Sequence, residues 1–380
     1  MNPNFSIHSF FIVITALSLS FLLASCTPAA DGSNSLSSSE KLGKALFFDT
    51  RLSSPEGQSC ASCHHPERGF AHPDTKIATA EGAVKGLFGN RNSPSIAYIK
   101  YTPAFHKTIE DGDTLYIGGF FLDGREKTLQ AQAIKPMLNP LEMGNKNTSE
   151  LLKKVIAAGY QPAFDQLFGA ASLNNEKIAM QHISQVISDY ENSKELSPFN
   201  SKYDAHLAGK TQLSKQEQQG LKLFNAEDKG NCAACHPSKI DESTGFPPLF
   251  TDYTYDNLGV PSNPDNHFLN NPAIHNPEGI AYRDKGLGDF LKDEKQNGKF
   301  KVPTLRNITL TAPYMHNGVF TTLKEVVDFY NTRDTDNKWA DAEISENVNT
   351  DELGDLKLSD DEVDAIVAFL KTLTDGYQTP

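Results

Sequence analysis

Residues 60–65 read CASCHH and residues 231–237 read NCAACHP, so each stretch contains a Cys-x-x-Cys-His motif. The chain has five cysteines, and four of them form these two pairs. Three chemistries use this spacing: a zinc site with four ligands from the two pairs, a redox-active dithiol, and covalent attachment of c-type haem. Haem attachment would use all three residues of each motif, and the rest of the sequence must decide.

The N-terminus indicates export. Phe10 to Leu23 is an uncharged apolar run of 14 residues, shorter than the roughly 20 that a membrane-spanning helix needs. It leads into Leu-Ala-Ser-Cys, which resembles a bacterial lipoprotein signal with Cys26 as the lipidated first residue; an ordinary secretory signal is the alternative. We expect a signal peptide at 1–25, a polar flexible tether at 26–40, and a periplasmic or cell-envelope protein with a lipid anchor as its sole membrane contact.

Export bears on the choice of chemistry, because an oxidising compartment normally converts thiol pairs into disulfides. With Cys26 lipidated, all remaining cysteines belong to the two motifs: Cys60, Cys63, Cys232 and Cys235. Thioether bonds to haem would prevent disulfide formation, and His64 and His236 would each supply an iron ligand. We therefore expect two covalently bound c-type haems.

The two motifs lie in similar local contexts. Each follows a glycine-led helical turn that carries Leu-Phe and then a polar loop, in GKALFFDTRLSSPEGQSCASCH (43–64) and GLKLFNAEDKGNCAACH (220–236). This degenerate repeat predicts two related domains. We place an N-terminal haem domain at 41–200 and a C-terminal haem domain at 201–380.

Helical spacing dominates elsewhere. Apolar side chains recur at helical intervals in two stretches, Ile178, Ile183, Val186, Ile187, Tyr190 and Val363, Ile366, Val367, Leu370, Leu373. Long alternating strand patterns are absent, and the Pro- and Gly-rich residues 242–280 are typical of irregular loops. The predicted fold class is all-α, with two cytochrome c-like haem domains, long loops and a last helix (about 359–374) that packs on the body.

The net charge of −13 argues against nucleic acid as a partner and against general attraction to anionic membranes. An acidic surface suits a basic or dipolar protein partner.

Three further stretches carry a resemblance: RNSPS (91–95), FFLDGREKTLQAQAIKPMLNPLEMG (120–144) and VPTLRNITLTAPYMHNGVFTTLKEVVDFYN (302–331). Together with the two motifs they resemble the bacterial di-haem cytochrome c peroxidase family, including its MauG-like branch, over roughly 40–375. The resemblance implies an enzyme that reduces hydrogen peroxide to water with electrons from a small redox protein, a cytochrome c or a cupredoxin. It also allows a homodimer.

The resemblance assigns roles to individual residues. His64 would be the proximal ligand of the N-terminal, peroxide-reactive haem, and His236 that of the C-terminal haem, which takes in electrons. The catalytic glutamate falls on Glu142 in NPLEM, and its supporting glutamine on Gln132. A carboxylate with a pKa raised by desolvation can take a proton from the bound peroxide and return it to the leaving oxygen.

The resemblance also implies a calcium site, formed by Asn92, Thr311 and Pro313, the last two through backbone carbonyls. The sixth ligand of the C-terminal haem falls on Tyr330, 19 residues after the calcium-site threonine. Cytochrome c peroxidases have methionine there, and MauG-like proteins have tyrosine, an anionic donor that lowers the potential. Met315 and His316 are the alternatives, although we interpret PYMHNG as a structural turn.

Two departures from the family bear on function. The loop histidine that caps the N-terminal haem in the peroxidase branch is replaced by Ala83, which predicts an open haem; the nearby His72 is interpreted as a surface histidine. Leu122 replaces the tryptophan often found between the haems, which puts MauG-type charge sharing in doubt. Besides a peroxidase, a MauG-like oxidase that modifies a partner protein and a non-catalytic electron carrier stay open as alternatives.

Overall fold

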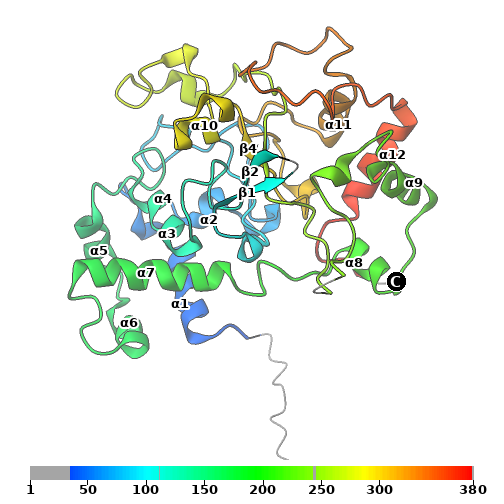
Figure 1. Ribbon diagram of the computed structural model, residues 1–380. Helices are drawn as coiled ribbons and strands as arrows, with labels where there is room; N and C mark the ends of the chain where they lie inside the picture. The colour runs from blue at the N-terminus through cyan, green and yellow to red at the C-terminus, as the bar shows by residue number, and fades with distance from the viewer. Residues whose placement is uncertain (1–34, 111, 243–244, 379–380) are drawn as a thin grey trace, which may run out of the picture. The chain divides into compact units, whose positions relative to one another are not determined.

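Helices make up most of the regular structure in the described residues, which are 35–110, 112–242 and 245–378 of the computed structural model (Figure 1). The α-helices are α1 (Ser38–Phe48), α2 (Cys60–Cys63), α3 (Leu129–Ala133), α4 (Lys135–Leu138), α5 (Thr148–Ala157), α6 (Gln161–Phe168), α7 (Glu176–Glu191), α8 (Lys202–Leu207), α9 (Lys215–Phe224), α10 (Leu287–Leu291), α11 (Leu323–Thr332) and α12 (Asp360–Lys371). Short strands form two antiparallel pairs, β1 (His106–Glu110) with β2 (Asp113–Ile117) and β3 (Tyr255–Asp256) with β4 (Phe300–Lys301).

Two helix pairs frame the fold, α1 against α7 and α9 against α12 (Figure 1). A Cβ atom on Gly43 of α1 would lie 1.8 Å from the carbonyl oxygen of Val186 in α7. A Cβ atom on Gly220 of α9 would lie 1.9 Å from the carbonyl oxygen of Ala365 in α12. Both pairs therefore cross at a point where a hydrogen atom fits and a methyl group does not. The glycines that open the predicted repeat have the same packing role in each half.

The buried apolar side chains divide along the sequence. One cluster draws its buried members from Tyr203 to Leu373, and the other two clusters draw theirs from Leu42 to Leu196. The chain from Leu36 onward is nevertheless one compact unit. The predicted boundary between 200 and 201 coincides with the gap between the clusters and stays a prediction.

The two helices predicted from apolar residues at helical intervals are confirmed. Helix α7 contains the periodic stretch that ends at Tyr190, and α12 covers the predicted last helix except for its ends. Helix α12 packs against α9 and α11, as expected. Residues 242–280 contain little regular structure among those described.

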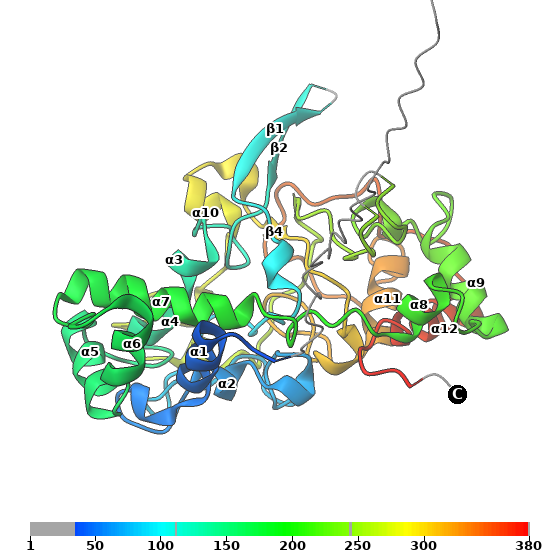
Figure 2. The same cartoon turned by 90° about the horizontal axis from the view of Figure 1, so that it is seen from below.

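Two predictions of local structure need correction. The fold is not purely helical, because β1 and β2 form a hairpin that projects from the body (Figure 2). The tether predicted at 26–40 extends three residues too far, because a capping box between Ser37 and Glu40 starts α1 at Ser38. The signal peptide and Cys26 lie outside the described residues. None of the helices in the described part of the chain is long and apolar enough to cross a membrane.

We expect Gly43→Ala and Gly220→Ala each to lower the free energy of unfolding of the haem-loaded protein by about 1–3 kcal/mol, because the added methyl forces the helices apart. Alanine's advantage in helix propensity, about 1 kcal/mol, is too small to offset this. Denaturant unfolding measures the change. Gln219→Ala, exposed on α9 next to Gly220, is the control and should stay within about 0.5 kcal/mol of wild type. Wild-type stability in both glycine variants would contradict the close crossing.

Candidate functional site

One cavity of about 470 Å³ is lined by both halves of the chain. Its wall includes every site residue predicted within the described part of the chain: Cys60, Cys63, His64, Asn92, Gln132, Glu142, Cys232, Cys235, His236, Thr311, Pro313 and Tyr330. These residues span more than 250 positions of sequence, and the tertiary fold brings them together around one cavity. The cavity also has apolar walls from residues such as Ile96, Leu305 and Leu370, as a large flat cofactor requires.

The two motif histidines are held in the same way. His64 follows α2, and its Nδ1 donates to the carbonyl oxygen of Phe70 at 3.1 Å. His236 follows the short 3₁₀ turn Cys232–Ala234, and its Nδ1 donates to the carbonyl oxygen of Phe250 at 2.7 Å. In this tautomer Nε2 carries the lone pair that can bind a metal, and the Nδ1 bond fixes the ring direction.

Burial keeps both imidazoles neutral. It lowers the pKa of His64 and that of His236 to about 4, even though the backbone hydrogen bond of each ring acts in the opposite direction. A neutral imidazole is the form that ligates iron. Both rings are therefore ready to act as metal ligands at neutral pH.

Within the described part of the chain, no disulfide joins any of the four motif cysteines. Burial raises the pKa of Cys63, Cys232 and Cys235 to about 12, whereas redox-active Cys-x-x-Cys pairs have lowered thiol pKa values. Residues 35–110, 112–242 and 245–378 contain no group of three or more His, Cys, Asp or Glu side chains that could hold a metal ion. The zinc site built from both pairs is therefore not formed, and the residues present fit covalent haem attachment.

Glu142 lies in the loop after α4 and faces the cavity close to the N-terminal motif, since its charge influences the thiols of Cys60 and Cys63. Burial raises its pKa, and the hydrogen bond from Asn139 opposes this rise. That bond runs from Asn139 Nδ2 to Glu142 Oε1 at 2.9 Å. Gln132, on α3, lines the same cavity.

The segment that replaces the capping loop is packed onto the NPLEM loop. The backbone N–H of Ala83 donates to the carbonyl oxygen of Glu142 at 2.6 Å. Gly82 lies so close that a Cβ atom there would be 2.5 Å from the carbonyl oxygen of Leu141. Ala83 therefore steadies the glutamate's backbone and offers no side-chain ligand.

His72 is not the surface histidine that we predicted. It is only 8% exposed, and its Nδ1 lies 3.0 Å from the carbonyl oxygen of Asp74. It does not belong to the described lining of the cavity. The loop around this ring is polar in sequence and gives no signal of its burial.

Tyr330, on α11, lines the cavity beside the C-terminal motif, and the thiols of Cys232 and Cys235 influence its titration. Burial raises the pKa of its phenol above the ordinary value. Met315 also lines the cavity, but it has a left-handed backbone (φ 73°) at the start of a turn. That turn is closed by a bridge between Tyr314 and Phe320. PYMHNG is thus a turn in the structure, as predicted.

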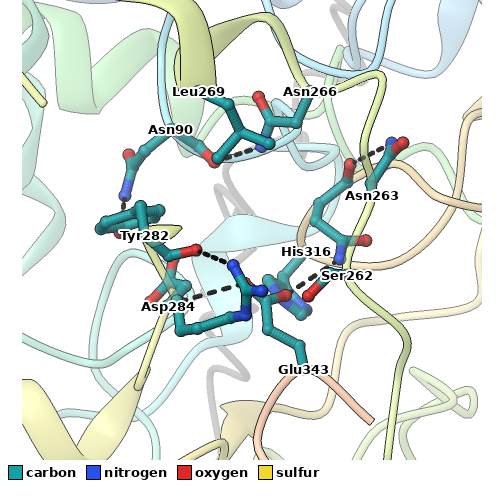
Figure 3. Close-up of a pocket in the computed structure, with 11 residues that line it drawn as sticks. Asn90, Ser262, Asn263, Asn266, Leu269, Tyr282, Asp284, His316 and Glu343 are labelled. Atoms are coloured by element: carbon teal, nitrogen blue, oxygen red, sulfur yellow. Dashed lines mark hydrogen bonds and ion pairs between the residues drawn. The ribbon is translucent and has the colours of Figure 1, made fainter. Parts of the chain in front are cut away.

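His316 also lines the cavity, but its ring has other partners. Its Nε2 lies 3.0 Å from Glu343 Oε2, and its ring stacks on Phe300 with centroids 3.9 Å apart. Figure 3 shows His316 and Glu343 beside a small polar pocket, with Asn90 and Tyr282 joined by a hydrogen bond. The pocket's volume of about 10 Å³ has room for a single water. It is no substrate site.

Two of the three predicted calcium ligands, Asn92 and Pro313, lie next to each other. The carboxamide of Asn92 lies 2.6 Å from the carbonyl oxygen of Pro313 and 3.4 Å from that of Met315, and the N–H of Asn92 donates to the carbonyl oxygen of His316. Thr311 lines the same cavity. The two ends of a carboxamide exchange by a half turn. Turned over, the amide would present its oxygen beside these carbonyls, which is the donor set that calcium prefers.

Sequence reasoning missed Glu191, the last residue of α7. It is 6% exposed and lines the cavity, and its Oε2 is buried without a hydrogen-bond partner in the described part of the chain. Burial raises its pKa to about 8. The available signal was a carboxylate in the last turn of an amphipathic helix, where the helix dipole disfavours it. Asn139 was also missed, although it lies within the quoted NPLEM stretch.

The cavity wall contains Leu122 and Arg91, and Arg91 belongs to a buried ion-pair network. The carbonyl oxygen of Leu122 accepts from the N–H of Lys301 at 2.8 Å. Arg91 pairs with Asp284 at 2.6 Å and with Asp123 at 2.7 Å. The side chains of Arg91, Asp123 and Asp284 are each at most 14% exposed. Because Asp123 belongs to the N-terminal half and Asp284 to the C-terminal half, Arg91 links the two halves.

Comparisons with known proteins point in one direction. A family model described as di-haem cytochrome c peroxidase matches residues 37–212. The methylamine utilization protein MauG of Paracoccus denitrificans is 35% identical over 356 residues, 89% of each chain. The cytochrome c551 peroxidase of Nitrosomonas europaea is 31% identical over 88% of this chain and 79% of its own. The crystal structure of the diheme peroxidase BthA from Burkholderia thailandensis has a TM-score of 0.78 at 33% identity, covering 90% of this chain and 88% of that one.

A helical chain that presents two Cys-x-x-Cys-His motifs to one cavity defines a di-haem c-type protein. This chain belongs to the di-haem cytochrome c peroxidase family. It is an oxidoreductase of that family, whose name states that its members carry two haems.

We expect Arg91→Met to lower the free energy of unfolding by about 3–5 kcal/mol, because Asp284 is left as a buried charge without its cation. Denaturant unfolding of the haem-loaded protein measures the loss. The control is Lys324→Met, since Lys324 and its partner Asp364 are 54% and 47% exposed, and its loss should be at most about 1 kcal/mol. Equal losses in the two variants would refute the structural role of the buried pair.

Proposed function

We propose that the protein reduces hydrogen peroxide to water at the N-terminal motif, with electrons from a small redox protein that enter at the C-terminal motif. The observation that carries this proposal is the position of Glu142 in the cavity wall near Cys60 and Cys63. An electron carrier needs no acid–base group at its haem, whereas peroxide cleavage does.

Two c-type haems fit the residues present. Cys60, Cys63 and His64 would hold one, and the second would be held by the equivalent residues Cys232, Cys235 and His236. When bound, the haem supplies an iron that delivers electrons to the oxygen–oxygen bond of peroxide. The chain's own part is to bind and orient the reactants and to move protons.

Glu142 moves the proton. Its Oε1 is held by the Asn139 amide, so the carboxylate has a fixed direction, and its backbone is fixed by Ala83. As a carboxylate it accepts the proton from one peroxide oxygen, and as an acid it returns that proton to the departing oxygen. The raised pKa brings the two forms closer in free energy at neutral pH than in an exposed glutamate. Gln132 offers a further amide for holding the peroxide.

Tyr330 is the proposed sixth ligand of the C-terminal haem. It lines the cavity at the C-terminal motif, and the alternative His316 is paired with Glu343. Burial alone would keep the phenol protonated, but the charge of a nearby metal ion reverses this preference. Met315 is the other candidate, and its place in the PYMHNG turn favours a structural role.

A MauG-like oxidation of a partner protein is the second candidate. The 35% identity to MauG of Paracoccus denitrificans favours it, as does Ala83, which leaves the N-terminal haem without a capping histidine. Leu122 argues against it, because leucine cannot carry an oxidised intermediate between the two motifs. Peroxide turnover with a reduced cytochrome distinguishes the candidates.

The proposal also includes a calcium ion, two haem domains and a location in the cell envelope. The convergence of carbonyl oxygens on Asn92 supports one calcium ion held with Pro313 and Thr311. The separate apolar clusters on either side of residue 200 support two haem domains. The N-terminal sequence supports a periplasmic, lipid-anchored protein, and a homodimer is part of the proposal.

We expect Glu142→Gln to lower peroxide turnover by at least about a hundredfold, because glutamine keeps the size and hydrogen bonding but cannot exchange the proton. Steady-state assays with a reduced cytochrome measure this, and haem content should not change. The exposed Glu67→Gln is the matched control and should retain full activity. Nearly full activity in Glu142→Gln with both haems in place would falsify the catalytic role.

We expect Tyr330→Phe to change the ferric spectrum of the C-terminal haem and to raise its potential, because an anionic donor is lost. Spectroscopy and redox titration check both effects. Met315→Leu should leave the spectrum and the potential nearly unchanged. If the two variants behave the other way round, the ligand is Met315.

A further inference from the structure

Acidic residues are concentrated in one segment of the chain. From Asp334 to Asp364 there are twelve acidic residues and two lysines, a net charge of −10, which leaves −3 of the chain's −13 for all other residues. The segment follows directly after α11 and extends into α12. Five of its members line the cavity, namely Glu343, Ile344, Glu352, Leu353 and Leu356, and the charge of Glu352 influences the thiol of Cys235 in the C-terminal motif. The acidity of the protein is therefore a local property of the chain around this motif.

Ion pairs neutralise only part of this charge. Salt bridges to Lys or Arg hold Asp334, Asp336, Asp355, Glu362 and Asp364, and Glu343 accepts a hydrogen bond from His316. Among the described residues, Asp341, Glu346 and Asp351 are exposed and have no ion-pair partner within 4 Å. These three carboxylates present an uncompensated negative field to an approaching protein.

The same segment contains the chain's one tryptophan. Trp339 is partly buried, and its Nε1 donates to Thr332 Oγ1 at 2.9 Å. The ammonium of Lys338 lies 4.8 Å from the centre of its ring. The indole is thus fixed in orientation at the surface, two residues from Asp341.

Packed aromatic rings connect Trp339 to the cavity. The centres of the Trp339 and Phe329 rings are 5.3 Å apart, and those of Phe329 and Tyr330 are 5.9 Å apart. Tyr330 lines the cavity, and its phenol is influenced by the thiols of Cys232 and Cys235. A continuous path of ring contacts therefore runs from the partly buried indole to the C-terminal motif. Electrons tunnel more readily through packed atoms than across gaps.

We propose that Trp339 is the contact point at which a small redox protein with a lysine-rich face docks and passes electrons toward the C-terminal motif, with Asp341, Glu346 and Asp351 steering its approach. This inference rests on the proposed function, and it identifies the charge of the donor and its binding site. The field of the exposed carboxylates selects a basic donor face, and the ring path explains why docking here is productive.

The electron count is balanced. Reduction of one hydrogen peroxide to two waters consumes two electrons and two protons. Two donor molecules dock in succession, and each loses one electron. No bond forms or breaks at Trp339, which is left unchanged after each transfer. The protons come from solvent.

The first experiment measures docking without turnover. The probe is oxidised mitochondrial cytochrome c, a small haem protein with lysines around its haem edge, titrated calorimetrically into the haem-loaded protein without peroxide. The triple variant Asp341→Asn, Glu346→Gln, Asp351→Asn should bind about tenfold more weakly at low salt, and the difference should vanish at high salt.

The control triple variant Glu67→Gln, Glu110→Gln, Glu278→Gln removes the same charge from exposed sites elsewhere and should bind like wild type. Cytochrome c with acetylated lysines should bind weakly to all of them.

The second experiment measures transfer. With peroxide present, Trp339→Phe should bind the probe like wild type but oxidise reduced cytochrome c several-fold more slowly, whereas Trp339→Tyr should retain more of the rate. Turnover with a small dye as donor, which needs no protein docking, should be unaffected by either change. Normal turnover with the dye also shows that the variants are folded and active.

Wild-type rates in Trp339→Phe, or equal binding by the two triple variants, would overturn the docking site. Absence of turnover with every donor would instead refute the proposed function.

Discussion

Two hydrogen bonds fix the chemistry of this protein: those from His64 and His236 to the carbonyl oxygens of Phe70 and Phe250. Each acceptor belongs to a phenylalanine with a left-handed backbone, at φ values of 58° and 54°. This conformation costs a bulky residue of order 1–3 kcal/mol and persists only where the surroundings fix it. Each carbonyl oxygen fixes the direction of the imidazole that donates to it. The helix pairs that cross at Gly43 and Gly220 hold that backbone in each half.

The two halves of the chain hold their motif histidines in the same way, but they bring different chemical groups to the cavity. The N-terminal half brings a buried carboxylate, Glu142, to the cavity, with Asn139 to orient it. The C-terminal half brings the phenol of Tyr330, and an aromatic path leads from it to Trp339. One half therefore has the means to move protons, and the other has a route for electrons. This division of chemical groups supports the proposed peroxidase more strongly than either half does alone.

The sequence predicts features that depend on neighbouring residues. The two motifs, the repeated glycines and the helices α7 and α12 could all be predicted, because each follows from local spacing. Features that depend on distant contacts could not. His72 is buried and Glu191 reaches the cavity because loops and helices far apart in sequence fold against them. The β1–β2 hairpin was missed because each of its strands has only five residues, too few for a clear alternating pattern.

The most direct test of the account is the mass of the intact, purified protein under denaturing conditions. Two thioether-bound haems predict that the polypeptide is heavier than its sequence by the mass of two haems. Replacing Cys60 and Cys63 with alanine should remove one of them, and replacing Cys232 and Cys235 should remove the other. A polypeptide of unmodified mass, from a preparation that contains haem, would contradict covalent attachment and with it the assignment of both motifs.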